Sequence, residues 1–245
     1  MNHDSVREAS DFFNSLLGYE PGVIALLDRL YADHPDAVFF DIGALHGYYA
    51  ALVGTRFPGW QVAAFEPNPE AFSVLEANFQ RLEIKGQALR RAVNAMGDDL
   101  HFRGRTIVAP STPDAIIVSG VRFDDMHTAF EAAAKIVKID VHGAEGLVLD
   151  GMREALIKVV TGLLVEIHAE HLIIGNYTYA AMLERLEESG FDVFEVENFR
   201  HSNTPALERL VSDRREQFVD FARWTPEQIS HERLLFAMRK CEGPS

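Results

Sequence analysis

The 245-residue sequence predicts one α/β domain with a mostly parallel sheet covered by helices on both faces. Short apolar runs alternate along the chain with segments of helical periodicity, the pattern of repeated strand–helix units. Hydrophobic residues make up 47% and charged residues 24%, which is a globular composition. No internal repeat and no linker rich in Gly, Pro or Ser divides the chain. We therefore expect a helical extension over 1–36 and one domain over 37–245.

The helices and strands of the extension and of the first half of the domain are predicted from the spacing of apolar residues and from residues that end helices. Val23, Leu26, Leu27 and Leu30 fall at helical spacing, and the residue before Pro35 is pushed out of the helical region. Strands are predicted at 37–43, 61–67 and 88–95, with helices at 46–57 and from Asn68 onwards. Asn68 is the expected cap of the second of these helices.

The second half continues the alternation after an irregular insertion. Residues 98–123 are rich in strand-forming residues but interrupted by Pro and Gly, which indicates an inserted hairpin or edge strands. Further strands are predicted at 136–141, 163–167, 192–197 and 234–239, and helices at 144–158 and 177–189. The polar stretch 198–232 is long for a plain connection and is a candidate lid or interaction element.

The charge balance restricts the classes of partner. Acidic residues outnumber basic ones by 37 to 23, and the formal net charge of −14 disfavours nucleic acid and anionic membrane surfaces. Cys241 is the only cysteine, so no intramolecular disulfide can form and a reducing compartment suits the chain. The sequence shows neither a signal peptide nor an apolar stretch of about 20 residues. We expect a cytoplasmic protein that does not bind membranes.

The turn after the first predicted strand has the spacing D-x-G-x-x-x-G, from Asp41 through Gly43 to Gly47. In open α/β sheets, ligands bind at such strand-to-helix turns, and the exposed N–H groups suit a carboxylate or another anion. The spacing differs from the dinucleotide pattern G-x-G-x-x-G. Glycines that serve only a packed turn are an equally open interpretation.

Glu66 ends the second predicted strand, 23 residues after Gly43. An acidic residue at this place can accept hydrogen bonds from both hydroxyls of a ribose. The alternative is a solvated carboxylate before a Pro-Asn-Pro turn. Together, the turn and Glu66 indicate a nucleoside-containing cofactor with little phosphate, and S-adenosylmethionine fits that description.

Titratable side chains follow the fourth and fifth predicted strands. Asp140 could stabilise a sulfonium, and His142 could take up a proton near neutral pH. A surface-loop histidine is the alternative for His142. Because strand residues alternate, Glu166 and His168 point the same way, and with Asp140 they could bind a divalent metal. A polar rim of the cleft without metal is the preferred interpretation of this group.

Taken in order, these segments resemble the FkbM family of S-adenosylmethionine-dependent methyltransferases. The resemblance covers roughly residues 37–197 and is carried most specifically by the Lys-Ile-Asp-Val-x-Gly-Ala-Glu run from Lys138 to Glu145. It implies a Rossmann-like seven-stranded sheet of order 3-2-1-4-5-7-6 with the last strand antiparallel. The resemblance implies that the methionine part of the cofactor is bound by Asp41, Gly43, Ala44, His46, Gly47 and Tyr48. It implies that the ribose is bound by Glu66, Pro67 and Asn68. The adenine is then expected beside Ala92, Val93 and Asn94.

Two positions depart from the family pattern. Leu45 stands where the family usually has Asn, which removes a polar contact near the cofactor. His142 stands where it often has Glu, which changes the charge and the proton-transfer chemistry beside Asp140.

The expected activity is O-methylation of a hydroxyl on a small molecule such as a sugar or secondary metabolite. Asp140, His142 and His168 are the candidate catalytic residues, and a homo-oligomer is compatible with the sequence. Three alternatives stay open: a metal-assisted O-methyltransferase, a non-catalytic nucleoside-binding or protein-interaction module, and an NAD-dependent oxidoreductase disfavoured by the glycine spacing.

Overall fold

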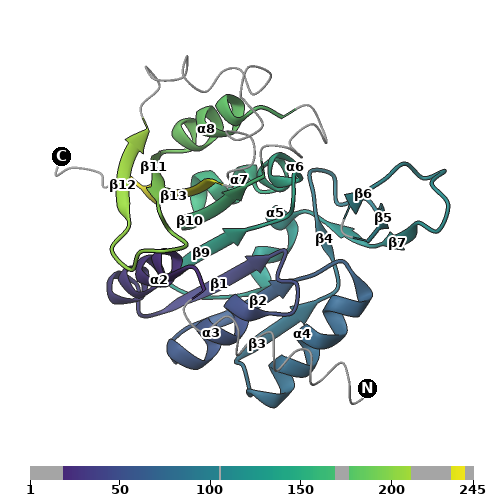
Figure 1. Cartoon of the computed structure of the whole chain (residues 1–245), viewed down its shortest axis with the longest axis horizontal. Helices are drawn as coiled ribbons and strands as arrows, with labels where there is room; N and C mark the ends of the chain where they lie inside the picture. Colours follow the sequence, from purple (N-terminus) through teal and green to yellow (C-terminus); the bar gives the residue numbers. More distant parts are fainter. Residues whose placement is uncertain (1–18, 105, 169–176, 211–232, 241–245) are drawn as a thin grey trace.

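A central eight-stranded sheet organises the chain (Figure 1). The computed structural model describes residues 19–104, 106–168, 177–210 and 233–240. The strand order is β12-β11-β13-β10-β9-β1-β2-β3. Its strands are β1 (Ala37–Ile42), β2 (Gln61–Phe65), β3 (Gly86–Leu89), β9 (Ala134–Ile139), β10 (Val160–Ile167), β11 (Phe191–Glu197), β12 (Ala206–Leu210) and β13 (Arg233–Arg239).

The topology confirms the predicted strand order. Strands β3, β2, β1, β9 and β10 run parallel, whereas β13 inserts antiparallel between β10 and β11. An eighth strand, β12, pairs antiparallel with β11 at the edge of the sheet. The sequence analysis did not predict β12, because its residues lie in a polar stretch with weak strand signals. The remainder of the candidate lid, 211–232, lies outside the described residues.

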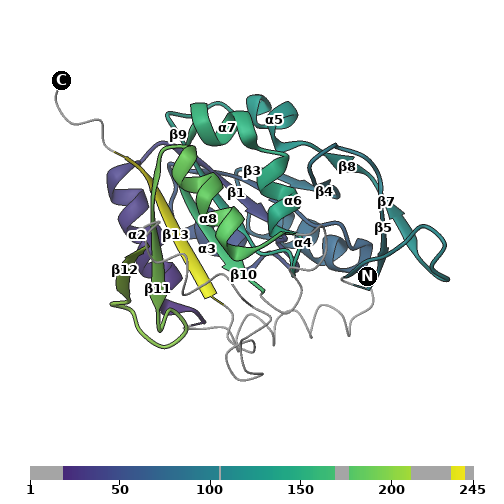
Figure 2. The same ribbon diagram turned by 90° about the horizontal axis from the view of Figure 1, so that it is seen from above.

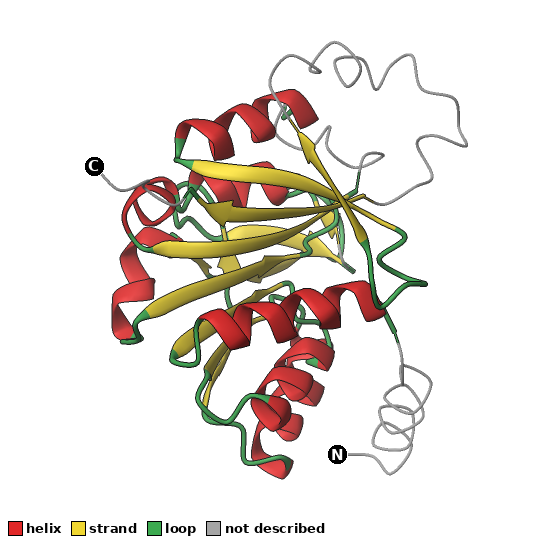
Figure 3. Cartoon of the chain, turned by 90° about the vertical axis from the view of Figure 1, so that its left-hand side faces the viewer, coloured by secondary structure: helices red, strands yellow, loops and turns green. Residues whose placement is uncertain are grey.

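Helices cover both faces of the sheet (Figure 3). One face carries α2 (Pro21–Asp33), α3 (Tyr48–Arg56) and α4 (Pro69–Arg81). The other carries α6 (Glu145–Asp150), α7 (Arg153–Lys158) and α8 (Tyr179–Glu188), with α5 (Phe123–Met126) and a 3-10 turn over His127–Ala129 beside them. The Asn68 side chain caps α4 as predicted, accepting hydrogen bonds from the N–H groups of Glu70 and Ala71.

Alternate residues of each central strand fill two separate hydrophobic cores. In β1, Val38 and Phe40 pack on the side of α6–α8, whereas Phe39 packs on the side of α2–α4. All six residues of β1 and of β9 are buried. Burial on both faces explains why β1 is apolar from Ala37 to Phe40, and it means that Lys135 and Lys138 of β9 are themselves buried.

Helix α2 belongs to the packing of the sheet, although the sequence placed it in an extension. Val23, Leu26, Leu27 and Leu30 are buried in the same core as Phe39 of β1. Trp60 Nε1 donates a hydrogen bond of 2.7 Å to the His34 carbonyl just after the helix. The domain boundary between residues 36 and 37 stays a prediction.

Two elements differ from the sequence predictions in their continuity. The predicted third strand, 88–95, is split into β3 and the short β4 (Ala92–Val93), which pairs with β8 (Gly120–Val121). The predicted helix 144–158 is broken into α6 and α7. The Asp124 carboxylate accepts hydrogen bonds from the N–H groups of Glu154 and Ala155, so α7 starts afresh with its own cap.

The insertion, expected as a hairpin or edge strands, folds as a small three-stranded antiparallel sheet. Strand β5 (Leu100–Arg103) pairs antiparallel with β6 (Thr106–Ile107) and with β7 (Ile116–Val118). Figure 2 shows this small sheet projecting beside α4, at one end of the central sheet. It stands over the carboxyl end of β2, where a ligand pocket is expected.

Truncating a buried residue of α2 should destabilise the whole domain. Leu30→Ala should lower the free energy of unfolding by about 2–5 kcal/mol, because it removes buried methyl groups from the shared core. Arg29→Ala, at an exposed position of the same helix, should change it by less than about 0.5 kcal/mol. Equal stability of both variants in urea unfolding would show that α2 is a dispensable extension.

Candidate functional site

Two adjoining pockets open at the carboxyl ends of β1, β2, β9 and β10. The apolar pocket is lined by Ile42, Phe65, Glu66, Pro67, Asn68, Arg91, Ala92, Val93, Leu100, Phe102, Gly104, Ile107, Val141, Ala144 and Leu147. The polar pocket is lined by Tyr19, Asp41, Ala44, His46, Tyr48, Tyr49, Lys138, Glu166, His168 and Arg200. Gly43, Leu45, Asp140 and His142 line both. This edge is where open α/β sheets bind ligands.

Gly43 allows the turn after β1 to touch the turn after β9. Its φ is +87°, and an added Cβ would lie 1.9 Å from the carbonyl oxygen of Asp140. Both the left-handed backbone and this contact exclude a larger residue. Gly47 plays a packing role instead, since its Cβ would meet the Leu75 side chain and it lines neither pocket.

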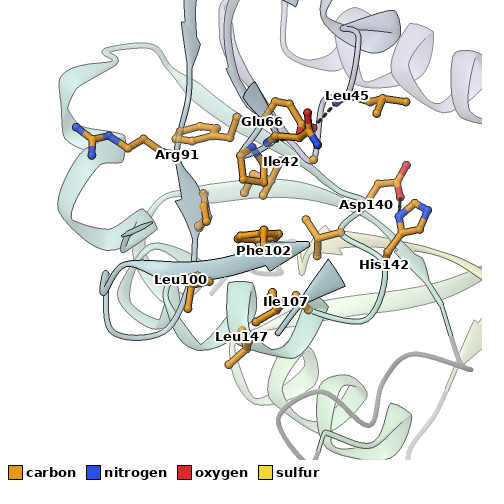
Figure 4. A pocket seen from close by; sticks show the side chains of 18 of the residues that line it. Ile42, Leu45, Glu66, Arg91, Leu100, Phe102, Ile107, Asp140, His142 and Leu147 are labelled. Atoms are coloured by element: carbon orange, nitrogen blue, oxygen red, sulfur yellow. Dashed lines mark hydrogen bonds and ion pairs between the residues drawn. The ribbon is translucent and has the colours of Figure 1, made fainter. Parts of the chain in front are cut away.

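Glu66 is held in place at the wall of the apolar pocket. Its Oε2 accepts a hydrogen bond of 2.8 Å from the Leu45 N–H, and its Oε1 accepts one of 2.8 Å from the Asn68 N–H (Figure 4). The side chain is buried, with 6% of its surface exposed. Each carboxylate oxygen has a second lone pair, so these bonds fix Glu66 and leave it able to accept hydrogen bonds from a ligand.

The opposite wall of the apolar pocket comes from the inserted hairpin. Leu100, Phe102 and Ile107 project from β5 and β6 toward the turn that carries Glu66 (Figure 4). Leu147 adds a further apolar side chain from α6. The sequence analysis recognised the hairpin but not this role, for which the alternating apolar residues Leu100 and Phe102 were the available signal.

A buried lysine organises the polar pocket. Lys138 lies one residue before the end of β9, in register with Asp41 of β1, and its Nζ lies 2.9 Å from Asp140 Oδ2. Burial alone would lower the pKa of Lys138, but the carboxylates of Asp140, Asp41 and Glu166 outweigh it and raise the pKa. Burial raises the pKa of Asp41 to about 6, against the lowering effect of Lys138. Lys138 therefore remains an ammonium ion surrounded by acidic side chains.

Asp140, His142 and His168 converge beside this lysine. Asp140 Oδ1 lies 3.6 Å from His142 Nδ1 and 3.7 Å from His168 Nε2. The two imidazole rings stack with centroids 4.2 Å apart. His168 is buried, and its Nδ1 lies 3.0 Å from Oε1 of the fully buried Glu145. The structure thus brings together the three predicted catalytic residues.

The structure brings together only two of the three residues that the sequence analysis considered as metal ligands, namely Asp140, Glu166 and His168. Asp140 and His168 meet, but Glu166 Oε1 forms an ion pair of 2.7 Å with Arg200. Arg200 also contacts the buried Glu20, with 3.4 Å between Nε and Oε1, and Glu20 accepts a hydrogen bond from the Tyr49 hydroxyl. Arg200 follows β11 in sequence, and no motif marked it as a pocket residue.

The other predicted cofactor residues fall at the two pockets with one further exception. Glu66, Pro67, Asn68, Ala92 and Val93 line the apolar pocket, and Asp41, His46 and Tyr48 line the polar one. Asn94, expected beside adenine, lines neither. Its side chain instead stabilises the following loop, because its Oδ1 accepts hydrogen bonds from the N–H groups of Met96 and Gly97.

Both departures from the family pattern occupy left-handed backbone positions. Leu45 has a φ of 50° and His142 a φ of 52°. Asn and His tolerate this region better than Leu does, so Leu45 is the more strained of the two. Strained residues of this kind often lie at binding sites, as both do here.

Adding a methyl group at Gly43 should disrupt the contact between the turn after β1 and the Asp140 carbonyl. Gly43→Ala should lower the free energy of unfolding by at least about 1–2 kcal/mol, from left-handed strain alone, and the clash with Asp140 adds to it. Gly104→Ala is the matched control, because Gly104 has a φ of +63° with nothing within 4 Å of its Cβ position. Similar thermal unfolding curves for the two variants would contradict the close contact.

Comparison with known proteins gives one family and two related sequences. The family model described as the methyltransferase FkbM domain matches residues 41–193. The hexuronic acid methyltransferase AglP of Haloferax volcanii is 33% identical over 156 residues, which cover 61% of this chain and 63% of that protein. The 31-O-demethyl-FK506 methyltransferase FkbM of Streptomyces tacrolimicus is 35% identical over 102 residues, covering 40% of this chain and 36% of that protein.

The matches span less than two thirds of either relative's length. A crystal structure of an O-methyltransferase from Bacillus cereus aligns at a TM-score of 0.47 and 10% identity, over 98% of this chain and 92% of that one.

None of the described helices is both long and apolar enough to cross a membrane. Because the family model covers more than half of the sequence, the chain belongs to the FkbM methyltransferase family.

Proposed function

We propose that this protein transfers a methyl group from S-adenosylmethionine to a hydroxyl of a small molecule. The observation that carries the proposal is the junction of the two pockets at Gly43 and Asp140, with a fixed Glu66 on one side and a cluster of histidines on the other. Family membership supports the reaction class.

The residues present fit the cofactor. Gly43 lines both pockets, so a ligand can run along its turn from one to the other, and the apolar pocket suits an adenine ring between Val93 and Phe102. Glu66 would accept hydrogen bonds from the ribose hydroxyls. Asp41, Ala44, His46 and Tyr48 would surround the methionine part. When bound, S-adenosylmethionine supplies an electrophilic methyl group whose bonding electrons remain with sulfur.

The acceptor hydroxyl is expected in the polar pocket, against Asp140, His142 and His168. The oxygen must lose its proton as it forms the new bond to carbon, and this cluster offers basic atoms for that purpose. Lys138 holds Asp140 Oδ2 and thereby keeps Oδ1 directed at both histidines. The walls of the pocket position the hydroxyl and limit its contact with water.

The chemistry of the polar pocket and the names of the relatives favour a polyhydroxylated acceptor. Tyrosine hydroxyls, carboxylates and cations from Tyr48, Glu166 and Arg200 provide many hydrogen-bonding groups. AglP is named for a hexuronic acid and FkbM for a 31-O-demethyl metabolite. A sugar or a hydroxylated secondary metabolite is therefore the proposed substrate class.

Changing Glu66 should weaken cofactor binding selectively. Glu66→Gln should reduce the affinity for S-adenosylhomocysteine at least about tenfold in calorimetry, because charge-assisted hydrogen bonds to the ribose are lost. Glu76→Gln, on the exposed side of α4, should bind as the wild type does. Unchanged affinity in Glu66→Gln would reject the ribose assignment.

Removing the imidazole of His142 should slow methyl transfer without loosening the cofactor. In His142→Ala, kcat should fall at least about tenfold, equivalent to about 1.4 kcal/mol in the barrier. Affinity for S-adenosylhomocysteine should stay near that of the wild type. Incubation with sugars and hydroxylated secondary metabolites, followed by mass spectrometry for a gain of one methylene, measures the rate. His201→Ala, at an exposed turn, is the control.

A further inference from the structure

Three potential metal-binding side chains lie close together at the wall of the polar pocket. Asp140 Oδ1, His142 Nδ1 and His168 Nε2 all lie within 4.8 Å of one another. Asp140 Oδ1 is buried and accepts no hydrogen bond from a described residue. Its distances of 3.6 and 3.7 Å to the two nitrogens are too long for direct hydrogen bonds. Because buried polar atoms normally have an interaction partner, we expect a bound ion or molecule between this oxygen and the two histidines.

The spacing of these atoms suits a metal ion. Donors that share a transition-metal ion at about 2.0–2.2 Å lie roughly 3–3.5 Å apart. The distances of 3.6 and 3.7 Å exceed this by little, whereas the widest separation in the set reaches 4.8 Å and the two imidazole rings are stacked. To share an ion with His168, His142 must rotate out of this stack, and 43% of its side chain is exposed, which gives it room to do so. Asp140 and His168 directly follow the neighbouring strands β9 and β10, and His142 lies in the turn after β9.

Outer contacts orient two of the three donors. His168 Nδ1 lies 3.0 Å from Glu145 Oε1, which also accepts a 3.0 Å hydrogen bond from the Gly143 N–H. An Nδ1–H donated to Glu145 leaves the Nε2 lone pair directed at Asp140. This carboxylate–histidine arrangement is the usual support of metal-binding imidazoles. Lys138 holds the other oxygen of Asp140 at 2.9 Å and leaves Oδ1 available.

The surrounding charge favours a cation. Four carboxylates, those of Asp41, Asp140, Glu145 and Glu166, are gathered around the cluster, and all but Asp140 are buried. The cations that face them are Lys138 and Arg200. An additional positive charge would reduce the repulsion among these carboxylates.

We propose that Asp140, His142 and His168 bind a divalent transition-metal ion of the Mn²⁺, Co²⁺ and Zn²⁺ class. Two imidazole nitrogens and one carboxylate oxygen are a ligand set that such ions accept while keeping positions open. Glu145 is the positioning residue for His168. Glu166, which the sequence analysis placed in the set, is instead the ion-pair partner of Arg200.

A catalytic use of the ion rests on the proposed function, whereas binding of the ion does not. An acceptor hydroxyl bound at an open position would have its pKa lowered by the cation. As the oxygen formed its bond to the methyl carbon, the bond between that carbon and the cofactor's sulfur would break and leave its electron pair on sulfur, and the hydroxyl proton would pass to water. With the ion bound, the two histidines would act as its ligands, and water would accept the proton that they would otherwise take up directly.

Titration of the protein with Co²⁺ alone, without cofactor or acceptor, tests the site directly. Visible absorption bands of a nitrogen- and oxygen-ligated ion should grow to one ion per chain. His142→Ala and His168→Ala should each weaken binding at least about tenfold, equivalent to about 1.4 kcal/mol. Competition with Mn²⁺ and Zn²⁺ then ranks the ions.

The control is His201→Ala, which removes an exposed histidine that lies outside both pockets and outside the donor group. It should bind Co²⁺ as the wild type does. His142 is the more exposed ligand, so its variant keeps the test valid if His168→Ala does not fold. No Co²⁺ binding by the wild type, or equal binding by folded His142→Ala, would overturn the site.

Failure of the metal site and failure of the proposed function give different results. Methyl transfer unaffected by exhaustive chelation, with no Co²⁺ bound, would reject the ion and leave the transferase standing. Co²⁺ bound through the two histidines, with no binding of S-adenosylhomocysteine, would reject the transferase and retain the metal site.

Discussion

The contact between Gly43 and the Asp140 carbonyl is the constraint on which the site depends. It requires that the turn after β1 carry no side chain at that point, and it brings the ends of two parallel strands together. The apolar pocket with Glu66 lies on one side of this contact, and the polar pocket with the histidines on the other. A reaction that moves a group from a nucleoside cofactor to a polar acceptor needs such a junction.

Charge compensation around Lys138 makes the polar pocket physically feasible. The lysine is almost fully buried, and without it the clustered carboxylates of Asp41 and Asp140 would face each other uncompensated. Its ammonium also lies 4.6 Å from the centre of the Tyr49 ring, which adds a cation–π contact. The strand register places Lys138 opposite Asp41, so the sheet itself sets this network.

Features that depend on local sequence were predictable, and features that depend on tertiary contacts were not. Buried runs such as residues 37–42, the Asn68 cap and the break before Pro35 follow from short-range rules, and the structure shows all three. The break between α6 and α7 depends on Asp124, about 30 residues away in sequence. Arg200 and Phe102 reach the pockets through the fold, and neither stands in a motif. The order of the strands came from the family resemblance, not from periodicity.

A crystal structure of the protein with S-adenosylhomocysteine is the most direct measurement of the central claim. The account predicts the adenosine in the apolar pocket, both ribose hydroxyls bonded to the Glu66 carboxylate, and the amino-acid end crossing Gly43 into the polar pocket. A nucleoside bound elsewhere, or a Glu66 that keeps only its bonds to Leu45 and Asn68, would contradict it.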